Sequence, residues 1–184
     1  LEKYWVLPRP DVLISVTGAA QGEISMRAKD KAMFERGLRN AAKQTNAWIL
    51  TGGTATGVMS MVGGMVQKAG NDAPVCLGIA PFGCVMHHEE MATSRGRIVS
   101  YPKTEQSELP RDRTALEPNH SHFVLVDDGQ TGNYGCEIEM RNQIEDHICA
   151  PLENDTIYDD NLPTPMVLLV VAGGPGTLQV RTLT

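Results

Sequence analysis

Three loops of this 184-residue chain combine glycine with threonine, residue types that can hold a phosphate group. Each follows a short apolar run: the first is Thr17-Gly18, the second spans residues 51–57 and the third spans residues 173–177. Glycine lets a phosphate approach backbone N–H groups, threonine adds a hydroxyl, and a following helix N-terminus adds a positive dipole. Such glycines also occur in simple tight turns, but three similar loops favour a nucleotide or sugar-phosphate site. Neither the GxGxxG fingerprint nor the P-loop motif is present.

Tyr134 and Arg141 form a second candidate group, because a spacing of seven residues puts both on one face of a helix, two turns apart. A planar ring and a bidentate cation suit an adenine or ribose and a pyrophosphate. The alternative is a packed tyrosine and a surface arginine paired with Glu137 or Glu145. The spacing alone leaves both interpretations open.

Other polar groups have simpler explanations. His120 and His122 share one face of a predicted strand, but no third ligand follows at a spacing typical of a metal site, so we expect hydrogen-bonded or solvent-facing histidines and no metal. The pair Asp127-Asp128 favours an Asx turn over a Mg²⁺ site. The four cysteines match no CxxC or zinc pattern and are expected to be reduced thiols; they are Cys76, Cys84, Cys136 and Cys149.

Five short apolar runs are predicted as strands that position these loops, the first of them as a buried strand. They span residues 12–16, 48–51, 75–80, 122–126 and 166–171. Helical spacing of apolar residues predicts helices over residues 25–44, 57–69 and 134–149, the second with Thr56 as its N-cap. Gly63-Gly64 inside the second helix predicts that another backbone packs closely there.

Continuously apolar strands that alternate with helices indicate a parallel sheet covered on both faces. We therefore expect an α/β fold, a Rossmann-like open parallel sheet in a single domain over residues 1–184. Residues 84–118 show no period and are interrupted by prolines, which predicts an irregular insertion. Because an open sheet normally continues after such a glycine loop, we expect the domain to be truncated at its C-terminus.

Composition excludes several classes of protein. Sixteen Lys and Arg against 22 Asp and Glu give a net charge of −6, which argues against a nucleic-acid binder. A hydrophobic content of 41% with 21% charged residues is typical of a globular domain and not of a disordered chain. No apolar run approaches the roughly 18 residues of a membrane helix, so this segment is not expected to insert into a membrane.

Several short segments of the chain occur together in one known family. They are residues 11–18, 48–54, 57–59, 78–81, 119–129, 134–135 and 173–177. Together they resemble the N-terminal homology region of TRPM (melastatin-type transient receptor potential) cation channels, over nearly the whole chain. The run from Asn119 to Phe123, followed by Asp127-Asp128-Gly129, is the most specific part. That region belongs to the SLOG superfamily of Rossmann-like nucleotide sensors, and the resemblance implies a cytosolic domain in the intersubunit ring of a homotetrameric, calcium-permeable plasma-membrane channel.

The resemblance also implies a ligand site for an adenine nucleotide such as ADP-ribose. The positions that match the family's site are Thr17, Gly18, Gly52, Gly53, Tyr134, Arg141, Gly173, Gly174, Gly176 and Thr177. The first loop departs from the family pattern, since it lacks the usual lysine and contains Glu23.

Enzymes of the phosphoribohydrolase LOG type share the Gly-Gly-x-Gly-Thr loop but place a catalytic glutamate three residues after its threonine. Here Val180 occupies that position, after Gln179, and neither side chain can act as a general acid or base. We therefore expect a regulatory ligand-binding and assembly domain without enzymatic activity. The alternatives are a nucleoside-phosphate hydrolase and a purely structural assembly domain, in which the basic helix over residues 25–44 would face an acidic neighbour.

Overall fold

The computed structural model describes residues 5–20, 24, 26–94, 96–102, 109–110, 112–151 and 162–172. Its strands are β1 (Leu13–Gly18), β2 (Trp48–Thr51), β3 (Cys76–Pro81), β4 (His122–Val126) and β5 (Met166–Val171). Its helices are α2 (Ala28–Gln44), α3 (Gly57–Ala69), α4 (His88–Ser94) and α5 (Glu137–Cys149), with 3₁₀ turns at Gly70–Asp72 and Phe82–Cys84. All neighbouring strands run parallel, which confirms the predicted α/β class.

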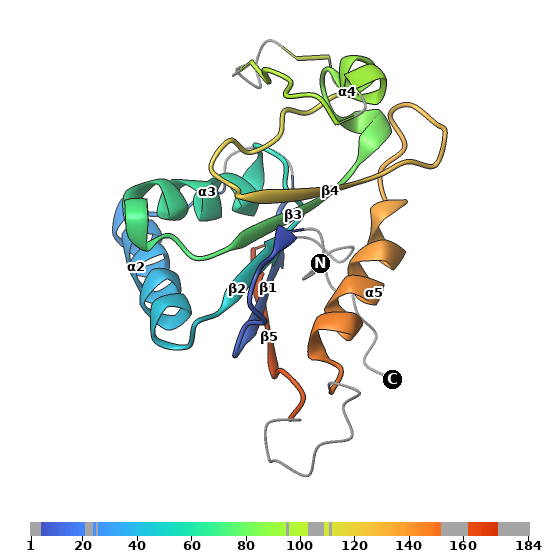
Figure 1. Ribbon diagram of the computed structural model, residues 1–184. Helices are drawn as coiled ribbons and strands as arrows, with labels where there is room; N and C mark the ends of the chain where they lie inside the picture. Colours follow the sequence, from blue (N-terminus) through green and yellow to red (C-terminus); the bar gives the residue numbers. More distant parts are fainter. Residues whose placement is uncertain are drawn as a thin grey trace.

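The strand order is β4-β3-β2-β1-β5 (Figure 1). The chain therefore moves outward from β1 through β2 and β3 to β4, and then returns through α5 to add β5 on the other side of β1. Leu13 of β1 is paired with Trp48 of β2 on one side and with Met166 of β5 on the other. Between β1 and β5 the direction of winding reverses, and in open parallel sheets ligands bind beyond the carboxyl ends of the strands at such a switch point.

Side chains alternate between the two faces of the sheet and build a core on each, as strand geometry requires. Helices α2 and α3 cover one face, and α5 covers the other (Figure 1). The first core includes Ile14, Val16, Ile49, Leu38, Val62 and Met65. The second includes Leu13, Leu50, Leu77, Ile79 and Ile148. The prediction of helices on both faces is therefore confirmed.

Two elements differ from the sequence prediction. Helix α5 begins at Glu137 and not at Tyr134, because Gly135 has a φ of +106°, a conformation that a helix does not contain. The insertion includes the seven-residue helix α4, which is too short to show a period, and it returns to the sheet through bridges from Thr54 to Leu116 and from Val85 to Thr114. Within the described residues, no helix has both the length and the apolar content that a membrane span requires.

Candidate functional site

The switch point is built from the ends of β1 and β5. A Cβ atom on Gly18 would lie 2.0 Å from the carbonyl oxygen of Val171, so only glycine fits where the two strands end together. The next residue, Ala19, donates its N–H to the same oxygen at 3.3 Å. Thr17 is buried just before this contact. The predicted site residues Gly173, Gly174, Gly176 and Thr177, together with Val180, lie outside the described residues.

The loop after β1 is held against the start of α3. The carbonyl oxygen of Ala19 accepts the N–H of Val58 at 3.0 Å, and the Thr56 hydroxyl donates to the Ala20 carbonyl oxygen at 2.6 Å. Gly57, with a φ of +52°, allows this approach, since a Cβ there would lie 1.9 Å from the Ala19 oxygen. Thr56 is confirmed as the residue before the helix, but its hydroxyl binds the first loop and does not cap α3. The Val58 N–H is therefore occupied by a carbonyl of the chain itself.

Arg141 forms a buried network that joins α5 to β1. Its Nε donates to Oε1 of Glu145 at 3.0 Å, and its Nη2 donates to the Ser15 hydroxyl at 2.8 Å and to the Val16 carbonyl at 3.1 Å. Ser15 in turn donates to the same Glu145 oxygen at 2.6 Å. Arg141 is 7% exposed and Glu145 3%. The pairing with Glu145 agrees with the alternative prediction, but the arginine lies in the interior beneath the switch point and not on the surface.

Tyr134 lies apart from this network. It is 51% exposed and precedes α5, so the prediction that Tyr134 and Arg141 share one helix face is wrong. Partial burial raises the pKa of its phenol, with smaller contributions from the neighbouring Cys84 and Asp112. Among the described residues, no hydrogen bond, ion pair or ring contact joins Tyr134 to Arg141.

Gly53, after β2, serves close packing, whereas a Cβ on the predicted site residue Gly52 would make only ordinary contact with Met59, at 3.6 Å from its Sδ. Gly53 has a φ of +70°, and a Cβ there would lie 2.8 Å from the Cα of Gly78 in β3. Its carbonyl accepts the N–H of Glu117 at 2.9 Å, and the Ala55 N–H donates to the Ala115 carbonyl at 2.8 Å. The insertion thus lies along this loop, and Gly53 is buried beneath it.

A second buried network, missed by the sequence analysis, holds the insertion in place. The Thr51 hydroxyl lies 2.7 Å from Nε2 of His120, whose Nδ1 lies 2.9 Å from Oε2 of Glu117. The Glu117 carboxylate also accepts the backbone N–H of Asn119 at 2.8 Å and its side-chain amide at 2.9 Å. All three members of the network are buried, so this Thr-His-Glu arrangement is structural and presents no accessible nucleophile.

Gly63 of α3 is the one sequence signal for that network. A Cβ there would lie 1.9 Å from the Cδ atom of Glu117. The prediction that another backbone packs closely at Gly63-Gly64 is therefore wrong, because the group that approaches Gly63 is the side-chain carboxylate of Glu117. Gly64 has only an ordinary contact, 3.8 Å from Oε1 of Glu35.

The aspartate pair and the cysteines singled out in the sequence have structural explanations. Asp127 and Asp128 accept the N–H groups of Gly129 and Gln130, each at 2.9 Å, so the predicted Asx turns are present. The Asn133 amide donates to Asp128 at 2.6 Å and lowers the pKa of that carboxyl. Cysteines 76, 84, 136 and 149 are free thiols, the first two of them buried. In the part of the chain that the structure describes, no three His, Cys, Asp or Glu side chains are grouped to hold a metal ion.

Comparison with known proteins identifies the domain. The sequence model of a family described as "SLOG in TRPM" matches residues 1–182. The chain belongs to this family. Members of the transient receptor potential M group resemble it along nearly its whole length: the subfamily M member-like 2 channel of Nematostella vectensis is 42% identical over 96% of the chain. Subfamily M member 2 of Rattus norvegicus and member 1 of Mus musculus are each 37% identical over 97% of the chain.

This SLOG domain spans a small part of such channels. It covers 12% of the Nematostella and rat proteins and 11% of the mouse protein. The predicted resemblance to TRPM channels is therefore confirmed at the level of the family. The relatives are named as cation channels, and their names do not specify a ligand for this domain.

Proposed function

We propose that this SLOG domain is a cytosolic regulatory and assembly domain of a calcium-permeable TRPM-type channel, and that it binds an adenine nucleotide such as ADP-ribose. The observation that carries the proposal is the switch point between β1 and β5, with a buried arginine directly beneath it. A parallel sheet binds ligands at that edge, and a guanidinium is the side chain best suited to a phosphate oxygen there.

Arg141 can take part in binding without losing its buried partner. A guanidinium carries five N–H donors. The bonds to Ser15, Val16 and Glu145 use the donors of Nε and Nη2, and Nη1 takes no part in these three bonds. We propose that Nη1 binds a phosphate oxygen of the nucleotide while Glu145 keeps the guanidinium in position.

The same contacts suggest how binding reaches the rest of the channel. Arg141 belongs to α5, whereas Ser15 and Val16 belong to the central strand β1. A phosphate that binds Arg141 changes the strength of the contact between helix and strand. Such a ligand shifts gating only if its affinity differs between the closed and open channel.

We further propose that the domain does not hydrolyse its ligand. The supporting observation is Val180 at the position of the catalytic glutamate of the LOG-type enzymes. Incubation of the purified channel with ADP-ribose or adenosine monophosphate should release no more product than a heat-denatured control.

Calorimetry with ADP-ribose on the full-length channel tests the proposal. Arg141→Lys keeps a cation beside Glu145 but lacks the planar fork, so we expect about ten-fold weaker binding. The control is Arg39→Ala on α2, which covers the opposite face of the sheet from α5 and should leave binding unchanged. Equal binding by Arg141→Lys and the parent channel would place the nucleotide elsewhere.

A further inference from the structure

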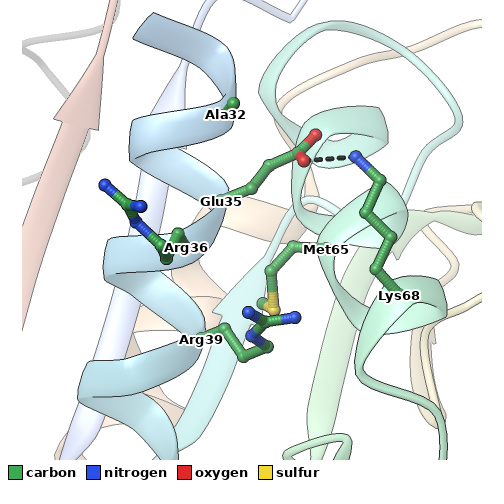
Figure 2. A pocket seen from close by; sticks show the side chains of 6 residues that line it. All are labelled: Ala32, Glu35, Arg36, Arg39, Met65 and Lys68. Atoms are coloured by element: carbon green, nitrogen blue, oxygen red, sulfur yellow. Dashed lines mark hydrogen bonds and ion pairs between the residues drawn. The ribbon is translucent and has the colours of Figure 1, made fainter. Parts of the chain in front are cut away.

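Helices α2 and α3 enclose a groove that has no part in the nucleotide site. Its volume is about 240 Å³. The residues that line it are Ala32, Glu35, Arg36, Arg39, Met65 and Lys68 (Figure 2). Met65 is 1% exposed and forms an apolar floor, whereas the charged side chains stand along the two helices. The groove therefore combines an apolar base with polar edges.

The charges of the groove are not balanced. Glu35 of α2 is 7% exposed, and its carboxylate forms an ion pair with Nζ of Lys68 from α3. Figure 2 shows Arg39 extending over Met65, while Arg36 points to the other side of α2. Within the described part of the chain, neither arginine has an ion pair or hydrogen bond. Two cations, Arg39 and Lys68, thus lie at the groove with one carboxylate, and Arg36 adds a third cation on the adjoining side of α2, on a chain whose net charge is −6.

The outer surface of α2 extends this cationic surface beyond the groove. Lys31 is exposed one turn before Glu35, Lys29 is exposed nearer the start of α2, and Met33 of the same helix is 55% exposed. Lys43, by contrast, pairs with Asp72 at 2.8 Å. Among the described residues, the cations of α2 that have no ion pair therefore lie in its N-terminal half and at the groove.

The chemistry of the groove selects a carboxylate-bearing protein segment. Phosphate sites use free backbone N–H groups at helix N-termini and glycine loops, whereas α2 and α3 line this groove with side chains from within the helices. Guanidinium groups bind carboxylates through two parallel hydrogen bonds. A membrane surface is flat, and Arg39 lies within a concave site.

We propose that the α2–α3 groove docks an acidic segment of the channel that lies outside residues 1–184. One of its Asp or Glu side chains binds the guanidinium of Arg39. This inference rests on the assembly role within the proposed function. It is independent of nucleotide binding, and the related channels are about eight times longer than this domain, so most of the protein is available as a partner.

Carbodiimide cross-linking of the full-length channel tests the proposal, because this reagent joins lysine amines to carboxylates that touch them. Besides the Lys68–Glu35 pair, mass spectrometry should find Lys68 or Lys31 joined to an Asp or Glu outside this domain, which identifies the docked segment. Coupling of these lysines only to carboxylates within residues 1–184 would overturn the proposal. A second outcome would also overturn it. If the same lysines are protected from acetylation only when the channel is in nanodiscs that contain anionic lipid, the groove binds a membrane surface and not a protein segment.

A charge swap then tests the role of Arg39. Arg39→Glu should reduce the yield of that cross-link about five-fold, since it replaces an attraction by a repulsion. Replacing the identified partner carboxylate by arginine should restore it. Arg97→Glu, the same charge change in the insertion outside the groove, should leave the yield unchanged. ADP-ribose calorimetry on Arg39→Glu should match the parent channel, so failure of the nucleotide proposal and failure of the docking proposal give different results.

Discussion

The two buried polar networks of this domain hold strand residues in the same way but differ in what lies next to them. The β1 network joins Ser15 to Arg141 and Glu145, which are 126 and 130 positions away, and it ends beneath the switch point. The β2 network joins Thr51 to Glu117 through His120, and the insertion covers it. Both involve a strand that is followed or ended by threonine and glycine: β1 ends with Thr17-Gly18, and β2 ends with Thr51 before Gly52. The sheet topology, and not the loop composition, distinguishes a candidate ligand site from a closed packing contact.

The largest expected effect comes from removing the cation of the β1 network. Arg141→Ala removes the guanidinium that neutralises the buried carboxylate of Glu145, so the free energy of unfolding should fall by about 3–5 kcal/mol. Urea denaturation of the N-terminal region measures this. Because Arg141 supports the fold, loss of nucleotide binding in Arg141→Ala alone does not demonstrate a phosphate contact.

A double variant distinguishes the loss of the Arg141–Glu145 ion pair from the cost of burying the charge of Glu145. Replacing both residues, with Arg141→Met and Glu145→Leu, removes both buried charges and should be far less destabilising than Arg141→Ala. If Arg141→Ala is as stable as the parent domain, Arg141 and Glu145 do not form a buried ion pair, and the description of the β1 network is wrong.

The β2 network predicts that a glycine-to-alanine substitution in α3 destabilises the domain, where such a substitution in a helix usually stabilises. In an exposed helix, glycine to alanine stabilises by about 0.5–1 kcal/mol. At Gly63 the new methyl group would collide with the Glu117 carboxylate, so Gly63→Ala should instead destabilise by about 1–3 kcal/mol. Gly37→Ala on α2 is the matched control, since a Cβ at this position would meet no atom within 4 Å beyond its chain neighbours and the backbone of the helix itself, and it should stabilise. A stabilising Gly63→Ala would show that Glu117 does not occupy this position.

Thiol alkylation reports how tightly the β2 network is closed. Cys76 is buried on β3, and burial together with the Glu117 charge raises the pKa of its thiol. Its backbone also bonds to Ser121 beside the network. Iodoacetamide at pH 8 should therefore modify the half-buried Cys149 first and Cys76 only on global unfolding, as peptide mass spectrometry would show. Early modification of Cys76 would mean that the network opens locally.

The smallest expected effect is the contribution of His122 to the pH dependence of the free energy of unfolding. Partial burial lowers the pKa of His122, so the folded state favours the neutral ring. The stability it contributes is present above the pKa of an unfolded histidine, about 6.5, and is lost as the pH falls below that value. Comparing the pH dependence of unfolding for the parent and His122→Gln measures this, and identical profiles would exclude a contribution from His122.

The positions of the strands were largely predictable from their continuous apolar runs. The predicted strands over residues 48–51, 122–126 and 166–171 coincide with β2, β4 and β5, although only β2 is buried along its whole length and Val167 and Leu168 of β5 are exposed. The start of α3 after Thr56 was also predicted correctly. These features depend on residues that are close in the sequence.

The arrangement of the candidate site was less predictable because its partners are distant. Nothing near Arg141 in the sequence indicates that Ser15 accepts its hydrogen bond. The seven-residue spacing places Tyr134 and Arg141 on one face only if a single helix contains both residues. Gly135, with its positive φ, ends that possibility, because the helix begins after it. Likewise, Gly63 in the middle of a helix indicates that another group packs closely there, but only the structure shows that this group is the Glu117 carboxylate.

The position of β5 beside β1 has a consequence for synthesis on the ribosome. Strands β1 to β4 can pair as they emerge, but the second edge of β1 must wait for β5, about 150 residues later. Arg9 and Thr164, whose side chains bond across this junction, are 155 positions apart. At roughly 5–20 residues per second, the second edge of β1 stays unpaired in the nascent sheet for about 8–30 s. During that interval β1 presents an open hydrogen-bonding edge, so chaperones that shield nascent strands would act on this segment first.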